Sequence, residues 1–298
     1  METTTIINSF LTNLPIHAPL FRSKLPCSFS ATIHHPTSHV PAQSLTISRP
    51  PPRRSLSSNC SLSQDTDATS ISATKVATVD SSLALKKKAM DVSPDLRGTS
   101  IFLVGLNNSL KSSMGKLLAD LLRYYYFDSD GLVSEAAGGV SAAIALKESD
   151  EKGFRESETE VLKQLSSMGR LVVCAGDGAV QSSTNLALLR HGISIWIDVP
   201  LDMIAKGIIE DKSQLLSSEI ANAGSYSEVL SQIAALYENL RTGYATADAT
   251  VSIQKIVNQL GYEDMDAVST EDITMEVLKE IEKLTRVKRM MEEAARPF

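Results

Sequence analysis

The chain has 298 residues, of which 43% are hydrophobic and 21% charged, and its formal net charge at pH 7 is −6. This composition is typical of a globular protein of one or two domains. No apolar run approaches the roughly 20 residues that span a membrane, so we do not expect a membrane protein.

The charge is distributed unevenly along the chain. Residues 1–64 contain five basic residues and a single acidic one, Glu2. The rest of the chain therefore has 24 basic and 34 acidic residues and a net charge of −10. A body this acidic argues against a nucleic acid as a partner.

Residues 1–64 are rich in Ser, Thr and Pro and have no acidic residue after Glu2. This composition predicts an organellar transit peptide, and the lack of a long Arg-rich amphipathic helix favours a chloroplast. Two of the three cysteines lie here, which leaves Cys174 alone in the remainder. We therefore expect a mature protein in the reducing chloroplast stroma. Residues 65–97, with a lysine run at 86–88, are predicted to form a polar linker.

The body opens with a strand, a loop and a helix. Ile101–Val104 is a continuous apolar run that predicts a buried strand of a parallel sheet, and Gly105 ends it. Apolar residues recur at helical spacing from Ser112 onward. Gly105, Lys111 and Ser112 occupy their positions in the phosphate-loop motif G-x-x-x-x-G-K-[ST], but Leu110 replaces the second glycine. The frame of a phosphate site is present with one part replaced.

An aromatic run at 124–127 predicts a second strand that ends at Asp128-Ser129-Asp130. Carboxylates at the carboxyl end of a strand face the ligand crevice of an open α/β sheet. Asp130 is equally well suited to cap the segment that begins at Gly131. On the residues alone, both roles for Asp130 stay open.

Arg155 lies near the start of a predicted helix over residues 151–168. It either clamps a ligand or forms an ion pair with Glu151 or Glu158, one turn away on the same helix. Taken in isolation, the ion pair is the better interpretation.

The remaining pattern alternates strands and helices. The expected elements are strand 171–175, helix 183–190, strand 193–197, helices 201–210 and 226–241, strand 249–253, and a helix opening at the capping-box pattern Ser269-x-x-Asp272. Residues 211–225 are predicted to form a mobile flap and residues 286–298 a charged, frayed or solvated tail. The alternation predicts one doubly wound α/β domain over residues 98–285, with a parallel sheet.

From Gly98 to about Leu284 the body resembles shikimate kinases. A phosphate loop, Asp-x-Asp, Phe-Arg-x-x-Glu, a glycine-rich turn and a flap follow in the family's order. The resemblance implies a five-stranded P-loop fold of the nucleoside monophosphate kinase type. It implies ATP binding by Gly105, Lys111, Ser112 and Ser113, Mg²⁺ binding by Ser112 and Asp128, and a shikimate pocket of Asp130, Arg155, Gly176, Asp177 and Gly178.

Several positions depart from the family pattern. The family loop Gly-x-Met-Gly-x-Gly-Lys-Ser/Thr reads Gly-Leu-Asn-Asn-Ser-Leu-Lys-Ser here, so Asn108 and Leu110 replace glycines. A β-carbon at a position with φ > 0 costs about 1–2 kcal/mol. Asp177 replaces a glycine of the substrate turn, and two like charges about 4 Å apart repel by roughly 4 kcal/mol. Ser213 replaces the flap arginine, and the adjacent Lys212 lacks its planar fork. The second substrate arginine is one position out of register, at Arg241.

These departures favour a catalytically inactive shikimate kinase-like protein. The chain also resembles plant chloroplast paralogues of this kind, which implies a role in chloroplast biogenesis. Two alternatives stay open: an active, divergent shikimate kinase that phosphorylates shikimate with ATP, and a kinase for another small molecule that is neutral or cationic near Asp177. We expect weakened ATP and Mg²⁺ binding, a monomer, and an unidentified protein or small-molecule partner in the stroma.

Overall fold

The computed structural model describes residues 72–210 and 225–296. Strands and helices alternate through most of this part of the chain. The strands are β1 (Ile101–Val104), β2 (Tyr125–Asp128), β3 (Leu171–Cys174), β4 (Ile193–Asp198) and β5 (Ala249–Ser252). The α-helices are α2 (Ser72–Leu96), α3 (Asn108–Leu122), α4 (Ser129–Ala136), α5 (Val140–Ser149), α6 (Glu151–Ser166), α7 (Ser183–Leu189), α8 (Leu201–Glu210), α10 (Tyr226–Tyr244), α11 (Ile253–Leu260) and α12 (Thr270–Ala294). Two 3₁₀ turns are η1 (Asp177–Val180) and η3 (Met265–Ala267).

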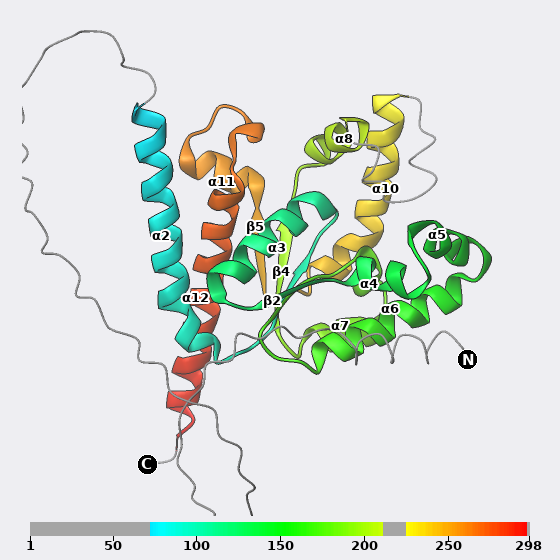
Figure 1. Ribbon diagram of the computed structural model, residues 1–298, viewed down its shortest axis with the longest axis horizontal. Coiled ribbons are helices and arrows are strands. Elements are labelled where there is room, and N and C mark those ends of the chain that lie inside the picture. Colours follow the sequence, from blue (N-terminus) through cyan, green and yellow to red (C-terminus); the bar gives the residue numbers. More distant parts are fainter. Residues whose placement is uncertain (1–71, 211–224, 297–298) are drawn as a thin grey trace, which may run out of the picture. The chain divides into compact units, whose positions relative to one another are not determined.

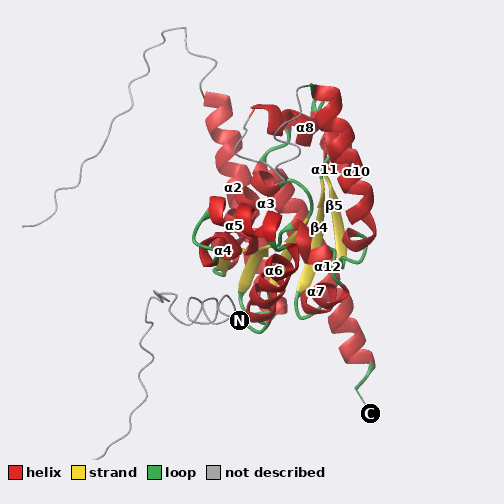
Figure 2. Cartoon of the chain, turned by 90° about the vertical axis from the view of Figure 1, so that its right-hand side faces the viewer, coloured by secondary structure: helices red, strands yellow, loops and turns green. Residues whose placement is uncertain are grey.

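The five strands form one parallel sheet in the order β2-β3-β1-β4-β5. Both β1 and β3 are buried along their whole length, which their continuous apolar sequences allow. Helices cover both faces: α2 and α12 lie on one side of the sheet and α6, α7 and α10 on the other (Figures 1 and 2). The predicted doubly wound, five-stranded sheet is confirmed.

Most predicted elements are present and end within a few residues of the predicted limits. The capping box is confirmed, since the Ser269 hydroxyl accepts from the backbone N–H of Asp272 and the Asp272 carboxylate accepts from that of Ser269. Helices α4, α5 and α11 were not predicted. For α11 a signal was present, because Ile253, Ile256 and Val257 are buried at helical spacing.

The prediction of a polar linker over residues 65–97 is wrong in its described part, because residues 72–96 form α2. Four of its side chains are buried in the core: Leu85, Ala89, Val92 and Leu96. Their spacing of four, three and four residues is that of one apolar helical face. The adjacent run of lysines concealed this pattern, and the folded body begins before Gly98.

α2 packs beside α12, and the two helices run in the same direction (Figure 1). Lys88 pairs with Glu282, and one heptad further along Arg289 donates to both carboxylate oxygens of Asp95 at 3.1 Å. Both pairs join residues 194 positions apart, as a parallel helix pair requires. Lys88 is therefore part of the helix packing, not of a solvated charge run.

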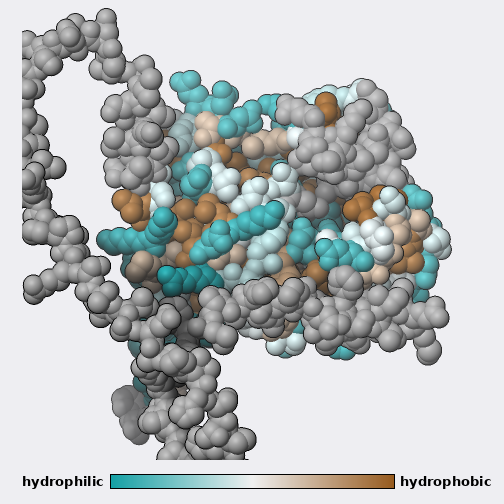
Figure 3. Space-filling model, in the orientation of Figure 1, coloured by the Kyte–Doolittle hydropathy of each residue, from teal (hydrophilic) through white to brown (hydrophobic). Residues whose placement is uncertain are grey.

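The predicted charged tail is helical as far as Ala294, where α12 ends, and its described side chains are exposed. It is therefore solvated but not frayed. The predicted transit peptide and residues 211–224 of the predicted flap lie outside the described residues. No helix in the described part of the chain is long and apolar enough to cross a membrane. On the face shown in Figure 3, hydrophobic residues gather in separate groups with hydrophilic ones between them.

Candidate functional site

The predicted phosphate loop runs directly into a helix. Helix α3 begins at Asn108, ahead of Lys111, and Asn107 is its N-cap. The side-chain oxygen of Asn107 accepts the Leu110 N–H at 2.9 Å, and its carbonyl oxygen accepts the Lys111 N–H at 3.1 Å. A phosphate loop binds its anion through backbone N–H groups of this kind. Here both groups already have a protein acceptor.

The backbone strain that we expected at the lost glycines is not found at Leu110. This residue lies in the first turn of α3, where φ is negative and a β-carbon is tolerated. Gly105, by contrast, has φ +138°, and a β-carbon there would lie 2.4 Å from the carbonyl oxygen of Ile197. The glycine that the packing of β1 against β4 requires is present, and the loop around Leu110 has adopted a conformation that needs none.

Lys111 faces the protein interior. Its side chain is 1% exposed, and its Nζ donates to the carbonyl oxygen of Ala175 at 2.9 Å. Its charge lowers the pKa of two nearby carboxyl groups, those of Asp130 and Asp177, against the effect of burial. In this structure the positive charge of Lys111 therefore stabilises the ionised forms of Asp130 and Asp177.

The pair predicted to hold Mg²⁺ stays together. The Ser112 hydroxyl lies 3.5 Å from Oδ2 of Asp128. The other carboxylate oxygen of Asp128 caps α4, accepting the N–H groups of Asp130 and Gly131 at 3.1 and 3.2 Å. The capping role that we considered for Asp130 therefore belongs to Asp128. Ser113 lies exposed on α3.

Asp130 and Asp177 form an acidic centre beside Lys111. Burial and the nearby Asp177 raise the pKa of Asp130 to about 7, against the opposing charge of Lys111. Burial also raises the pKa of Asp177, whose Oδ1 accepts a hydrogen bond from the Tyr244 hydroxyl at 3.0 Å. The two carboxyl groups therefore retain protons closer to neutral pH than ordinary aspartates. The repulsion that we expected between Asp177 and a ligand carboxylate is correspondingly reduced.

Two glycines bring the turn after β3 against acidic side chains. A β-carbon at Gly176 would lie 1.7 Å from a carboxylate oxygen of Asp130, and one at Gly178 would lie 2.2 Å from a carboxylate oxygen of Glu158. The N–H of Gly176 donates to the Ser129 hydroxyl at 2.9 Å. The turn after β3 therefore lies directly against Asp130 and Glu158, and it leaves no space for a side chain at either glycine.

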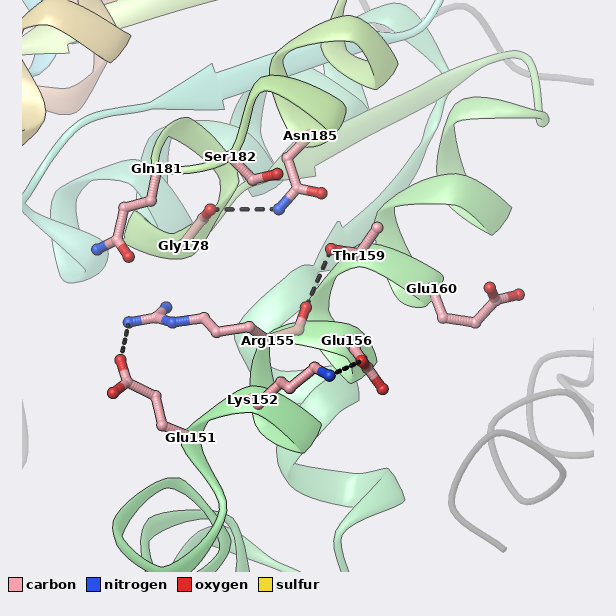
Figure 4. Close-up of a pocket in the computed structure, with 10 residues that line it drawn as sticks. All are labelled: Glu151, Lys152, Arg155, Glu156, Thr159, Glu160, Gly178, Gln181, Ser182 and Asn185. Carbon is pink, nitrogen blue, oxygen red and sulfur yellow. Dashed lines mark hydrogen bonds and ion pairs between the residues drawn. The ribbon is translucent and has the colours of Figure 1, made fainter. Parts of the chain in front are cut away.

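Arg155 is held by acids of its own helix. Its guanidinium lies 2.9 Å from the Glu158 carboxylate and 3.7 Å from that of Glu151. Of the two interpretations of Arg155, the ion pair is therefore the one observed. A cavity of about 520 Å³ lies between α6 and the segment that leads to α7. Figure 4 shows Arg155 extending from α6 toward Gly178 and Gln181 in this cavity.

Tyr244 also belongs to the acidic centre, although no motif in the sequence indicates it. Besides its bond to Asp177, its ring stacks on Trp196 with a centroid distance of 5.8 Å. A signal was available, because Tyr244 continues the helical pattern beyond the predicted end of α10 at 241. Arg241 does not enter the pocket, since it is 60% exposed and lies 3.7 Å from Glu238 on the surface.

These residues do not fit the triphosphate of a nucleotide. Asn107 occupies two backbone N–H groups of the would-be phosphate cradle, and the Lys111 ammonium is bound to Ala175. Only Ser112 and Asp128 remain arranged as a Mg²⁺-binding pair, and the part of the chain that the structure describes has no group of three potential His, Cys, Asp or Glu ligands.

The strand order, the helix that opens directly after β1 and the acidic pocket at the carboxyl ends of the strands define an α/β protein of the P-loop kinase class. A family model described as shikimate kinase matches residues 107–281, and the chain belongs to the shikimate kinase family.

Two plant relatives differ in their similarity to the chain. "Probable inactive shikimate kinase like 1, chloroplastic" of Arabidopsis thaliana is 61% identical over 238 residues, covering 80% of this chain and 81% of the relative. "Shikimate kinase 2, chloroplastic" of Oryza sativa subsp. japonica is 41% identical over 206 residues, covering 68% and 67%. The solved shikimate kinase of Acinetobacter baumannii in complex with shikimate has a TM-score of 0.52 at 22% identity and covers 65% of this chain and 98% of its own, which supports the fold alone.

Proposed function

We propose that this protein is a catalytically inactive member of the shikimate kinase family that acts in the chloroplast. The observation that carries the proposal is the Asn107 cap, which occupies the N–H groups of Leu110 and Lys111. Phosphoryl transfer depends almost entirely on positioning the phosphates and stabilising their charge. Because α3 begins before Lys111, the N–H groups of Leu110 and Lys111 are bonded to Asn107 and are not available to position a phosphate.

The relatives support the same conclusion. The Arabidopsis protein whose name includes "probable inactive" is 61% identical to the chain, whereas the rice shikimate kinase is 41% identical. Both are chloroplastic proteins, in agreement with the transit-like composition of residues 1–64. A fluorescent fusion of residues 1–80 should enter chloroplasts of leaf cells, and a cytosolic signal would contradict the location. The role in chloroplast biogenesis rests on the resemblance to plant paralogues, and its test is rescue of a mutant lacking the protein.

Calorimetry with ATP–Mg²⁺ tests the loop directly. The unmodified chain should not bind the nucleotide. Restoring the family loop with Asn107→Met, Asn108→Gly and Leu110→Gly removes the cap and the side chain at position 110, so some ATP binding should return. The matched control is Leu110→Ala, which shortens that side chain but leaves Asn107 in place and should bind no better than the unmodified chain. ATP binding by the unmodified chain would contradict the proposal.

Complementation of a bacterium that lacks shikimate kinase tests turnover. Neither the unmodified chain nor the loop variant should restore growth. Adding Asp177→Gly and Ser213→Arg to the loop variant should give measurable growth, because Asp128, Asp130 and Arg155 match the family pattern. Growth supported by the unmodified chain would establish an active kinase instead.

A second candidate function follows from the acidic pocket. Asp130, Asp177 and Glu158 together favour a neutral or cationic small molecule over a carboxylate, and burial raises the pKa of all three. Shikimate, an anion, should therefore bind more tightly at pH 5.5 than at pH 8. Its uncharged methyl ester should bind equally at both. Equal binding of shikimate at the two pH values would contradict a pocket selected by these acids.

A further inference from the structure

A second cavity lies at the end of the sheet opposite the predicted nucleotide and shikimate site. Its volume is about 320 Å³. Gly192 and Ile193, at the start of β4, and Asp248, directly before β5, form part of its wall. Ligands of open α/β sheets bind outside the carboxyl ends of the strands. This cavity is at the amino ends, so it does not belong to the shikimate and nucleotide pocket.

Elements outside the family match complete this cavity. The family model covers residues 107–281. The lining residues that lie beyond those limits are Asp95, Thr99, Leu284, Thr285 and Lys288. They come from the end of α2, the segment after it, and α12. The parallel helix pair therefore builds a cavity that the matched kinase region alone does not form.

Three basic side chains of this cavity have no partner among the residues that the structure describes. Arg190, His191 and Lys288 line it and make no side-chain hydrogen bond or ion pair there. Elsewhere on α12 the basic side chains are engaged, as Arg289 is with Asp95. Cationic groups gathered around a cavity without carboxylate partners are available to an anion.

The two carboxylates at the cavity are already engaged. Asp95 accepts two hydrogen bonds from Arg289, which neutralises it. Asp248 accepts the backbone N–H and the hydroxyl of Ser194 at 2.7 and 2.8 Å through a single oxygen. With Asp95 neutralised, the charges of Arg190, Lys288 and Asp248 leave one positive charge, without counting His191. This is opposite in sign to the net charge of the body.

We propose that this cavity binds a small phosphorylated metabolite. The guanidinium of Arg190 offers a planar fork to phosphate oxygens, and the ammonium of Lys288 offers a point charge. Leu284 and Ile193 give the wall an apolar part that suits a short carbon skeleton. The volume is at the lower end of small-molecule sites, which favours a ligand of sugar phosphate size over a dinucleotide.

The test is calorimetric titration of the full chain with ribose 5-phosphate and, separately, with inorganic phosphate. The ester should bind more tightly than phosphate, because only the ester reaches the apolar wall. The double variant Arg190→Ala/Lys288→Ala should weaken binding by about tenfold or more, since each lost bond was made to a charged group. The matched control Lys283→Ala/Arg286→Ala removes two exposed positive charges from α12 and should leave binding unchanged.

Three outcomes would overturn the proposal. One is no binding of either probe by the intact chain. Another is unchanged binding in the Arg190→Ala/Lys288→Ala variant, which would place the phosphate elsewhere, for example near Ser112. The third uses vesicles that contain phosphatidylglycerol: sedimentation with them that depends on Arg190 and Lys288, in a chain that binds no ribose 5-phosphate, would assign the site to a lipid headgroup.

Discussion

The segment after β1 and the turn after β3 meet at Lys111, whose backbone belongs to the first and whose Nζ contacts Ala175 at the second. In the first segment Asn107 caps α3 and satisfies backbone N–H groups, so the departure from the family is one of backbone conformation. In the turn, Gly176 still lies against Asp130, and the departure is a single added carboxyl group, that of Asp177.

These two kinds of change have different consequences. A backbone N–H that is bonded within a helix start is lost to a phosphate whatever side chains surround it. A carboxyl group changes its charge with pH and with its neighbours. We therefore expect the segment after β1 to bind no phosphate under ordinary conditions, whereas the groups beside Asp177 should respond strongly to pH and to single substitutions.

The largest effect is expected at Lys111, which the two regions share. Lys111→Ala removes a buried side chain and the donor to the Ala175 carbonyl, and large-to-small changes of this kind cost about 2–5 kcal/mol. Urea unfolding should show this loss. Lys116→Ala, at an exposed position of the same helix, is the control and should change the free energy of unfolding by less than about 0.5 kcal/mol. Equal effects would mean that Lys111 does not hold the two regions together.

The next effect in size concerns the pH dependence of the acidic centre. The pKa of Asp130 is raised to about 7, so the folded state binds its proton more tightly than the unfolded state does. Asp130 therefore lowers stability progressively as the pH rises from about 4 to about 7. Asp130→Asn cannot ionise and should be more stable than the unmodified chain at pH 8, by about 1–3 kcal/mol for this partly buried group.

Unfolding at pH 4.5 and pH 8 measures this difference. The advantage of Asp130→Asn should be small at pH 4.5, where the aspartate is largely protonated in the folded protein. The control, Asp120→Asn, changes an exposed carboxylate on α3 and should have similar effects at both pH values. An Asp130→Asn variant that is less stable than the unmodified chain at pH 8 would show that Lys111 stabilises the ionised Asp130 by more than burial and Asp177 destabilise it.

The fold was largely predictable from the sequence, because the central strands β1 and β3 are short apolar runs and many of the helices have periodic apolar faces. The exception with most consequence is α2. Its buried face at Leu85, Ala89, Val92 and Leu96 lies beside three lysines, so the composition indicates a polar linker where the spacing indicates a helix. The cavity at the amino ends of the strands depends on this helix and could not have been inferred without it.

The candidate site was predictable in its membership but not in its conformation. The family motif named Asp130 and Asp177, which the structure brings within electrostatic reach of each other and of Lys111. It gave no indication that Asn107 caps a helix that begins three residues before Lys111, because capping depends on backbone geometry. It also could not show the raised pKa of Asp130, which results from burial and from a neighbour distant in sequence.

A smaller effect is expected at Gly176. A β-carbon there would lie 1.7 Å from an Asp130 carboxylate oxygen, so Gly176→Ala must displace that side chain. We expect a loss of about 1–2 kcal/mol, since overpacking by one methyl group is partly relieved by rotation of the aspartate. Thermal unfolding of Gly176→Ala with and without Asp130→Ala checks the cause. If the second substitution does not recover the loss, the clash is not with Asp130.

The smallest expected effect tests the cap itself. Asn107→Ala removes the side-chain acceptor of the Leu110 N–H, and the loss of an N-cap of this type costs about 1 kcal/mol. Asn107→Asp keeps an acceptor and should stay close to the unmodified chain in urea unfolding. Neither variant should bind ATP–Mg²⁺, because the Lys111 N–H is still bonded to the backbone carbonyl of residue 107 and α3 can still begin there. If Asn107→Ala costs nothing while it gains nucleotide binding, the N–H groups are free to serve a phosphate. The departure from the family after β1 would then lie in side chains, as it does after β3, and not in the backbone conformation.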